Sequence, residues 1–311
     1  MKLWCITLLV FVVNAATAKG RVSVEPSDAI AHRKLHIPAG VNTTDEIHSY
    51  IVGVLTRALE LTEDEYGPVV LDMQREATVQ TRQILNLEKG MADIIWMISD
   101  SNRDARVLSV PIPIIGGLYG VRVLMVRKSD TRFSQTRTLA TLKKLSLTQG
   151  IGWPDTQILR SNGFNVTSNP YLAGFRAVSK NYVDAYPRAL HEANLELDND
   201  VTQGLMLDPH HLLFYPNPMF FYVDKKNIVL AKRIEYGLAL MIESGELQSL
   251  LENTTFYVRA KKALAGRKVF ELNNKQLSDS AVRAFNRYLE EKPLLEYARK
   301  SPRLKQSSTF N

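Results

Sequence analysis

Strand-like and helix-like patterns of apolar residues alternate along this chain from about residue 34. Consecutive or alternating apolar residues predict strands, and apolar residues that recur every three or four positions predict amphipathic helices. The near-continuous apolar run 93–98 is typical of a parallel strand that is covered on both faces. The predicted strands cover 35–37, 69–73, 93–98, 120–127, 147–151, 165–167, 183–186, 206–214 and 219–223. The predicted helices cover 45–61, 78–89, 139–145, 154–160, 171–180, 191–197, 229–242, 247–251 and a segment from about 279.

This alternation predicts an α/β fold in which helices cover both faces of mainly parallel sheets. Two such series follow each other, and each has the length of an ordinary domain, which indicates two lobes. We expect the chain to cross between the lobes near 126–130 and again near 221–226, and such a pair of crossings forms a hinge. The expected division is 19–126 for lobe 1, 127–224 for lobe 2, 225–300 for a return to lobe 1 with a helical extension, and 301–311 for a disordered tail.

The first 18 residues have the pattern of a cleaved secretory leader. Lys2 precedes an apolar run over 3–13, which is shorter than the roughly 20 residues that a membrane-spanning helix needs. Ala16 and Ala18 supply the small residues that signal peptidase accepts. An uncleaved anchor is the alternative. We expect cleavage near Ala18 and a mature protein in the periplasm.

Composition narrows the possible chemistry. The single cysteine, Cys5, lies in the predicted leader, so disulfides, a cysteine nucleophile and cysteine-based metal centres are not expected. The net charge of +7 is spread along the chain, which favours a solvated surface over nucleic-acid binding. His210 and His211 are adjacent, so on a strand their rings would point to opposite faces and no metal site is expected. No cofactor fingerprint or catalytic motif is recognised, and we expect a protein that is not an enzyme.

Several tracts resemble type II periplasmic solute-binding proteins of family 3, the receptors of ABC importers for amino acids and similar solutes. The tract 87–96 resembles the family's helix that ends in glycine and the strand that follows it. The turn 103–106 with its arginine and the apolar segment 110–113 come next in the same order. The tracts 215–224 and 242–250 resemble the return to lobe 1 and its last helix.

This resemblance implies two doubly wound lobes joined by a two-strand hinge, with a small polar solute held in the cleft between them. It also implies delivery of the solute to the membrane permease of an ABC importer, without catalysis. We expect a monomer. The turn 150–156 lacks the paired hydroxyl residues that many family members use for a carboxylate. The region in which many members place an aspartate for the amino group reads Asp184-Ala185-Tyr186-Pro187-Arg188, so the family's usual pattern is only half present. An α-amino acid is therefore not the only solute to consider.

The candidate ligand-binding residues stand near the predicted carboxyl ends of strands, where α/β proteins bind ligands. Arg103 and Arg188 could hold a carboxylate through their guanidinium groups, and this pair favours a carboxylate-bearing solute. The alternatives are ion pairs of Arg103 with Asp100 or Asp104, and of Arg188 with Glu192.

The other candidates are aromatic or polar. Trp153 lies in a loop before a helix whose first turn contains Asp155 and Thr156, and that loop could face the cleft. Ser99 could add a hydroxyl donor. Trp96 could stack on a solute, although its apolar neighbours favour a place in the core.

Two other functions remain open from the sequence. The same cleft could serve a membrane sensor kinase instead of an importer. The scaffold could also belong to a periplasmic enzyme that uses Asp155 or Glu192 as a base, which would require a raised carboxylate pKa in the cleft.

Overall fold

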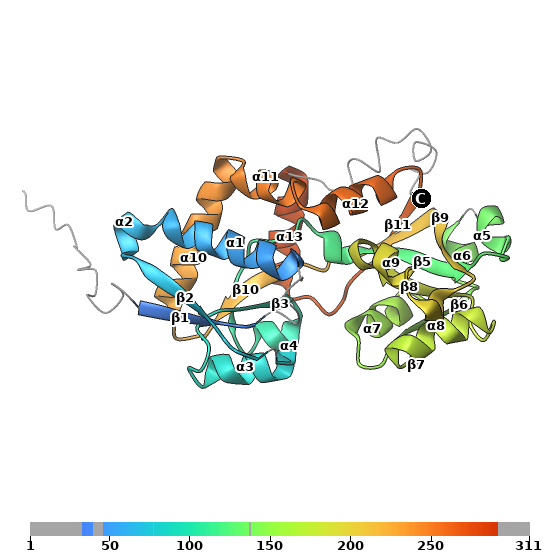
Figure 1. Ribbon diagram of the computed structural model, residues 1–311, viewed down its shortest axis with the longest axis horizontal. Coiled ribbons are helices and arrows are strands. Elements are labelled where there is room, and N and C mark those ends of the chain that lie inside the picture. The colour runs from blue at the N-terminus through green and yellow to red at the C-terminus, as the bar shows by residue number, and fades with distance from the viewer. Residues whose placement is uncertain (1–32, 40–45, 77, 137, 292–311) are drawn as a thin grey trace, which may run out of the picture.

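A computed structural model describes residues 33–39, 46–76, 78–136 and 138–291 of the protein. Two lobes lie side by side and are joined by extended segments near the middle of the molecule (Figure 1). The predicted leader (1–18) and the predicted tail (301–311) lie outside the described residues. Within those residues, no helix combines the length and the apolar character that crossing a membrane requires.

Lobe 1 is built from two small sheets that meet at one point. Strands β1 and β2 pair in parallel, and β3, β10 and β4 form an antiparallel sheet in that order. The two sheets meet where the backbone N–H of Asp93 donates to the carbonyl of His36 at 2.8 Å. The elements are β1 (Arg33–Ile37), α1 (Glu46–Glu60), α2 (Glu63–Tyr66), β2 (Val69–Met73), α3 (Gln80–Glu88), β3 (Ile95–Ile98), α4 (Ser101–Asp104), β4 (Leu108–Val110), β10 (Met219–Val223), α10 (Ile228–Glu243) and α11 (Glu246–Glu252).

The packing of α1 against α10 depends on a glycine. Helix α1 turns an apolar face toward the core, with residues such as Ile51 and Leu55 fully buried. A Cβ atom at Gly237 of α10 would lie 2.1 Å from the carbonyl oxygen of Ala58 in α1. Only glycine therefore allows the two helix backbones to approach this closely.

Lobe 2 contains a six-stranded mixed sheet in the order β11-β9-β5-β8-β6-β7. Strand β5 runs antiparallel to β8 and β9, whereas β6 is parallel to β7 and β8. Strand β5 is buried along nearly its whole length, as the central position in the sheet requires. The elements are η1 (Leu118–Gly120), β5 (Val121–Arg127), α5 (Arg132–Gln135), α6 (Leu139–Leu142), β6 (Ser146–Gly150), α7 (Pro154–Ser161), β7 (Asn165–Asn169), α8 (Tyr171–Ser179), β8 (Ala185–Ala189), α9 (Leu190–Glu196), η2 (Asp200–Thr202) and β9 (Leu205–Phe214).

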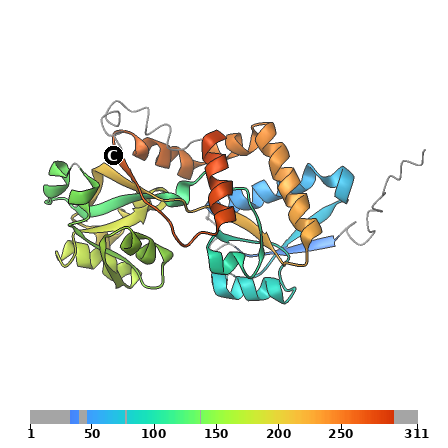
Figure 2. The same ribbon diagram turned by 180° about the vertical axis from the view of Figure 1, so that it is seen from behind.

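The C-terminal extension contacts both lobes. Helix α12 (Thr255–Leu264) follows α11, and β11 (Lys268–Glu271) then joins the edge of the lobe 2 sheet in parallel with β9. The chain next crosses back and ends the described part as α13 (Asp279–Glu291), which packs on lobe 1 (Figure 2). The extension therefore adds two connections between the lobes, because α12 leads from lobe 1 to lobe 2 and residues 272–278 lead back.

The two-lobed α/β class expected from the sequence is confirmed, with two differences in detail. The structure places both hinge crossings earlier in the chain than the sequence analysis does. Strand β5 already belongs to the lobe 2 sheet, and β10 already belongs to lobe 1. The crossings therefore precede these strands, and they contact each other where the N–H of Tyr215 donates to the carbonyl of Gly120 at 3.2 Å.

The second difference concerns β3. The sequence predicted a parallel strand, but β3 pairs antiparallel with β10. Its apolar pattern reflects one fully buried face and one partly buried face, which says nothing about the direction of its neighbour. That direction is set by β10, which returns from lobe 2 and enters the sheet from the opposite end.

Candidate ligand-binding cleft

A cleft of about 400 Å³ lies between the two lobes. Lobe 1 contributes the start of α3, the end of β3 and helix α4, and lobe 2 contributes the β6–α7 turn, the end of β8 and helix α9. The crossing segments contribute Tyr119 and Asn217. The lining residues are Gln80, Ile98, Arg103, Tyr119, Arg122, Gln149, Gly152, Trp153, Pro154, Asp155, Pro187, Arg188, Ala189, Glu192 and Asn217.

Arg103 faces the cleft from lobe 1 but is also bound within that lobe. Its Nε forms an ion pair with Asp100 at 2.9 Å, Nη1 donates to the carbonyl of Ile98 at 2.5 Å, and Nη2 donates to Oε1 of Gln80 at 2.9 Å. Asp100 also caps α4 by accepting from the backbone N–H of Arg103. A guanidinium has five N–H donors, so these three bonds fix the group and leave donors for a ligand.

A buried ion pair forms the base of the cleft in lobe 2. Nε of Arg122 lies 2.7 Å from Oδ1 of Asp155, and the hydroxyl of Tyr215 donates to the same carboxylate. Burial alone would raise the pKa of the Asp155 carboxyl, but the charge of Arg122 and these hydrogen bonds outweigh it and lower the pKa. Asp155 is therefore ionised and paired with Arg122.

The indole of Trp153 and the guanidinium of Arg188 stack and form part of the lobe 2 wall of the cleft. The indole lies over Gly150, where a Cβ atom would come within 2.3 Å of the ring. The guanidinium of Arg188 lies 4.8 Å from the indole ring and forms a buried ion pair with Glu196, with Nε 2.8 Å from Oε2. Three further rings surround this guanidinium at 4.7–5.8 Å, those of Tyr171, Phe175 and Tyr186.

Glu192 is the most exposed acidic group of the cleft. Its side chain is 45% exposed, and its carboxylate lies 3.5 Å from both Nη2 of Arg188 and Nε2 of His191. Burial would raise its pKa, but the contacts with His191 and the charges of Arg188 and Arg122 lower the pKa to about 2. Glu192 therefore stays ionised at neutral pH and presents a negative charge to the cleft.

Four of the seven predicted binding residues line the cleft, namely Arg103, Trp153, Asp155 and Arg188. The other three lie elsewhere. The hydroxyl of Ser99 donates to Asp104 at 3.0 Å, Trp96 packs edge-on against Phe221 in the lobe 1 core, and Thr156 is buried and directed at the carbonyl of Gly150. In each case these contacts within its own lobe hold the side chain away from the cleft.

The sequence analysis missed several lining residues. Arg122 is the one charged residue within the apolar run 121–126, and this signal could have identified it because a buried cation requires a partner. Gln149 stands at the carboxyl end of β6, and its amide donates to the carbonyl of Pro187 at 2.9 Å. Asn217 belongs to the second crossing, which the sequence placed too late in the chain. Its Oδ1 is buried without a hydrogen-bond partner.

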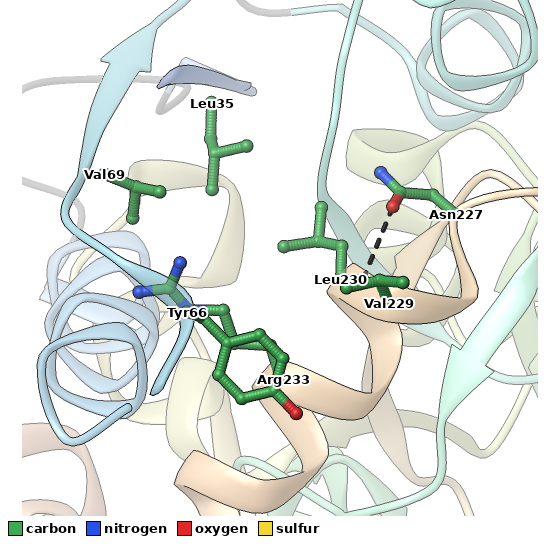
Figure 3. A pocket seen from close by; sticks show the side chains of 7 residues that line it. All are labelled: Leu35, Tyr66, Val69, Asn227, Val229, Leu230 and Arg233. Carbon is green, nitrogen blue, oxygen red and sulfur yellow. Dashed lines mark hydrogen bonds between the residues drawn. The ribbon is translucent and has the colours of Figure 1, made fainter. Parts of the chain in front are cut away.

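A second cavity, of about 30 Å³, lies inside lobe 1 between β1, β2 and the start of α10 (Figure 3). Arg233 is buried beside it and donates to Thr62 and to the carbonyls of Leu59 and Gly67 at 2.8–3.0 Å. The volume of this cavity suits a water molecule and is too small for a solute. Within the described residues, no three or more histidine, cysteine or acidic side chains gather as metal ligands do.

Two solved structures share the architecture of this chain. One is YtmK of Bacillus subtilis, described as a probable amino-acid ABC transporter extracellular-binding protein. It matches with a TM-score of 0.53 and 11% identity over 72% of this chain and 98% of its own. YckB of Bacillus subtilis matches with a TM-score of 0.52 and 16% identity over 79% of this chain and 98% of its own.

These likenesses confirm the two-lobed type II periplasmic binding protein fold that the sequence led us to expect. They extend to the fold alone, because the identities are low. No protein-family model matches the chain, and no curated protein matches it either.

Proposed function

We propose that this protein is an extracytoplasmic receptor that captures a small polar solute in the cleft between its lobes. One observation carries this proposal. The cleft is lined from both lobes, and its walls combine charged, amide and aromatic groups in a volume that suits a small molecule. The leader-like pattern of 1–18 supports export to the periplasm.

The solute that we propose carries a carboxylate and a second group that can donate hydrogen bonds or bear positive charge. Arg103 is the cleft arginine with the most accessible side chain, 20% exposed against 8% for Arg122 and 4% for Arg188. A carboxylate would therefore meet Arg103, whereas Arg122 and Arg188 stay with their buried partners. Glu192 would accept the second group from the lobe 2 side.

Catalysis is less well supported than binding. A general base works best with a pKa near the operating pH. The pKa values of Asp155 and Glu192 are instead held below their usual ranges by neighbouring cations. We therefore propose a binding protein that is not an enzyme. Its partner would be the permease of an ABC importer, and a sensor kinase is the alternative.

The experiment is a thermal melt with tryptophan fluorescence, using refolded protein and a panel of amino acids, dicarboxylates, short peptides and sugars. A ligand at about 100 times its Kd stabilises the native state by about 2.7 kcal/mol. We expect a carboxylate solute to raise Tm, and Arg103→Gln to abolish the shift. Arg82→Gln, an exposed arginine of α3, serves as the control.

Glu192→Gln should weaken the same solute, with the exposed Asp198→Asn as its control. A panel in which no compound raises Tm would contradict the receptor proposal. A Tm shift that survives both Arg103→Gln and Glu192→Gln would place the solute outside this cleft.

A further inference from the structure

Residues 272–278, which we call the strap, link β11 in lobe 2 to α13 on lobe 1 (Figure 2). Both of its ends are anchored by burial. Leu272 is buried in the lobe 2 core and Leu277 in the apolar cluster of lobe 1 that includes β3 and β10. The strap is therefore a short covalent connection between two apolar clusters, one in each lobe.

The middle of the strap is bonded to both walls of the cleft. Nε2 of Gln276 donates to the carbonyl of Pro154 in lobe 2 at 3.2 Å, and the carbonyl of Gln276 accepts from the N–H of Ser101 in lobe 1 at 2.7 Å. Pro154 lines the cleft and Ser101 begins the helix that carries Arg103. One residue thus spans the interlobe boundary beside the ligand site.

Further bonds hold the strap along its length. Asn273 and Asn162 of lobe 2 exchange two hydrogen bonds of 2.7 and 3.0 Å. The amide of Asn274 donates to the carbonyl of Pro216 in the second crossing at 2.9 Å. On the lobe 1 side the hydroxyl of Ser278 donates to Asp104 at 2.6 Å. Together these contacts fix the strap to lobe 2, to the second crossing and to lobe 1.

Past the strap, α13 adds one more contact between the lobes. Phe285 of α13 is fully buried and stacks on Phe214 at the end of β9, with ring centroids 6.2 Å apart. Two-lobed proteins open by rotation about a few residues in the crossing segments. A short connection that is anchored at both ends resists that rotation, because the lobes can separate only as far as its length allows and only if its contacts across the boundary break.

We propose that the strap holds the two lobes at one fixed separation, so that the cleft is preformed and does not open widely. This inference goes beyond the proposed receptor function and needs no solute to test it. Lengthening the strap should allow the lobes to move apart, whereas an insert of equal length elsewhere in lobe 2 should not.

The experiment measures the distance between spin labels on exposed residues of the two lobes, at Arg82→Cys and Gln157→Cys, with Cys5→Ser. We expect one narrow distance distribution for the otherwise unchanged protein. A flexible insert of about six Gly and Ser residues after Asn274 should shift part of the distribution to longer distances. The same insert after Lys180, at the exposed turn that follows α8, should leave the distribution unchanged.

A broad or two-component distribution in the protein without an insert would overturn the proposal. So would a narrow distribution that stays unchanged when the strap is lengthened. If the lengthened protein fails to fold, a shorter insert of about three Gly and Ser residues at the same place replaces it. A shift to longer distances would then support the proposal, and an unchanged distribution would overturn it.

Discussion

Removing the carboxylate of Asp155 tests whether it stabilises the buried charge of Arg122 at the base of the cleft. Asp155 is the acidic partner of Arg122 at 2.7 Å, and their side chains are 12% and 8% exposed. In Asp155→Ala the buried guanidinium would keep the carbonyls of Tyr119 and Val121, at 2.5 and 3.3 Å, and its place over the Tyr215 ring, 5.3 Å from the ring centre. Losing one partner of a buried ion pair costs about 3–5 kcal/mol.

We place this cost near the lower limit, about 3 kcal/mol, because Arg122 retains two neutral acceptors. The entropy of unfolding is about 2.1 cal/mol/K per residue, so for 311 residues this cost corresponds to a fall in Tm of roughly 5 °C. Differential scanning calorimetry and urea titration would measure it. The exposed Asp198→Ala should change Tm little and serves as the control.

A double-mutant cycle separates this interaction from packing. Arg122→Met removes the cation, so Asp155→Ala should cost less in that background than in the native protein. A loss in the double variant equal to the sum of the single losses would refute the reasoning. So would an Asp155→Ala variant as stable as the Asp198→Ala control.

The same pair predicts a dependence on pH. The pKa of the Asp155 carboxyl is lower in the folded protein than in the unfolded chain, so its stabilising contribution is present above about pH 4. That contribution is lost as pH falls through the lowered folded pKa. The native protein should therefore lose more stability than Asp155→Ala between pH 5 and pH 3, as measured by urea titration. Parallel losses would contradict the assignment.

Glycine substitutions supply two further predictions. Gly237→Ala should destabilise the protein by about 1–3 kcal/mol because the new Cβ would lie 2.1 Å from the carbonyl oxygen of Ala58. Gly53→Ala on α1 should stabilise it by about 0.5–1 kcal/mol, because a Cβ there has no atom within 4 Å and alanine favours the helix. Equal effects in urea titration would argue against close packing of α1 on α10. Gly150→Ala should displace the indole of Trp153 and shift its fluorescence emission to longer wavelength, and an unchanged spectrum would show that the ring does not lie over this backbone.

Most elements of the fold follow from local patterns. The helix predicted over 229–242 is α10 (Ile228–Glu243), and the strand predicted over 219–223 has the bounds of β10. Periodicity locates such elements because each must bury one face or both. It does not give strand direction or lobe membership, which is why β3 was assigned a parallel neighbour and β5 the wrong side of the hinge.

The site was predictable only in part. Trp153 and Arg188 follow strand ends, and that rule placed them correctly in the cleft. The same rule favoured Ser99, whose hydroxyl is instead bound to Asp104. Thr156 was chosen for its place at a helix start, but its side chain turns inward. Position along the chain selects candidates, whereas the direction of each side chain depends on the turn or helix that carries it.

The sequence by itself determined the α/β class, the approximate order of helices and strands, and the charged and aromatic residues that can reach strand ends. The tertiary structure decided which partners those residues take. Arg103 is held by Asp100, and Arg188 by Glu196, because folding a charge into a poorly hydrated site requires a nearby opposite charge. It also decided that the C-terminal extension joins both lobes. Such pairings depend on contacts between segments that are distant in the sequence, and local periodicity carries no information about them.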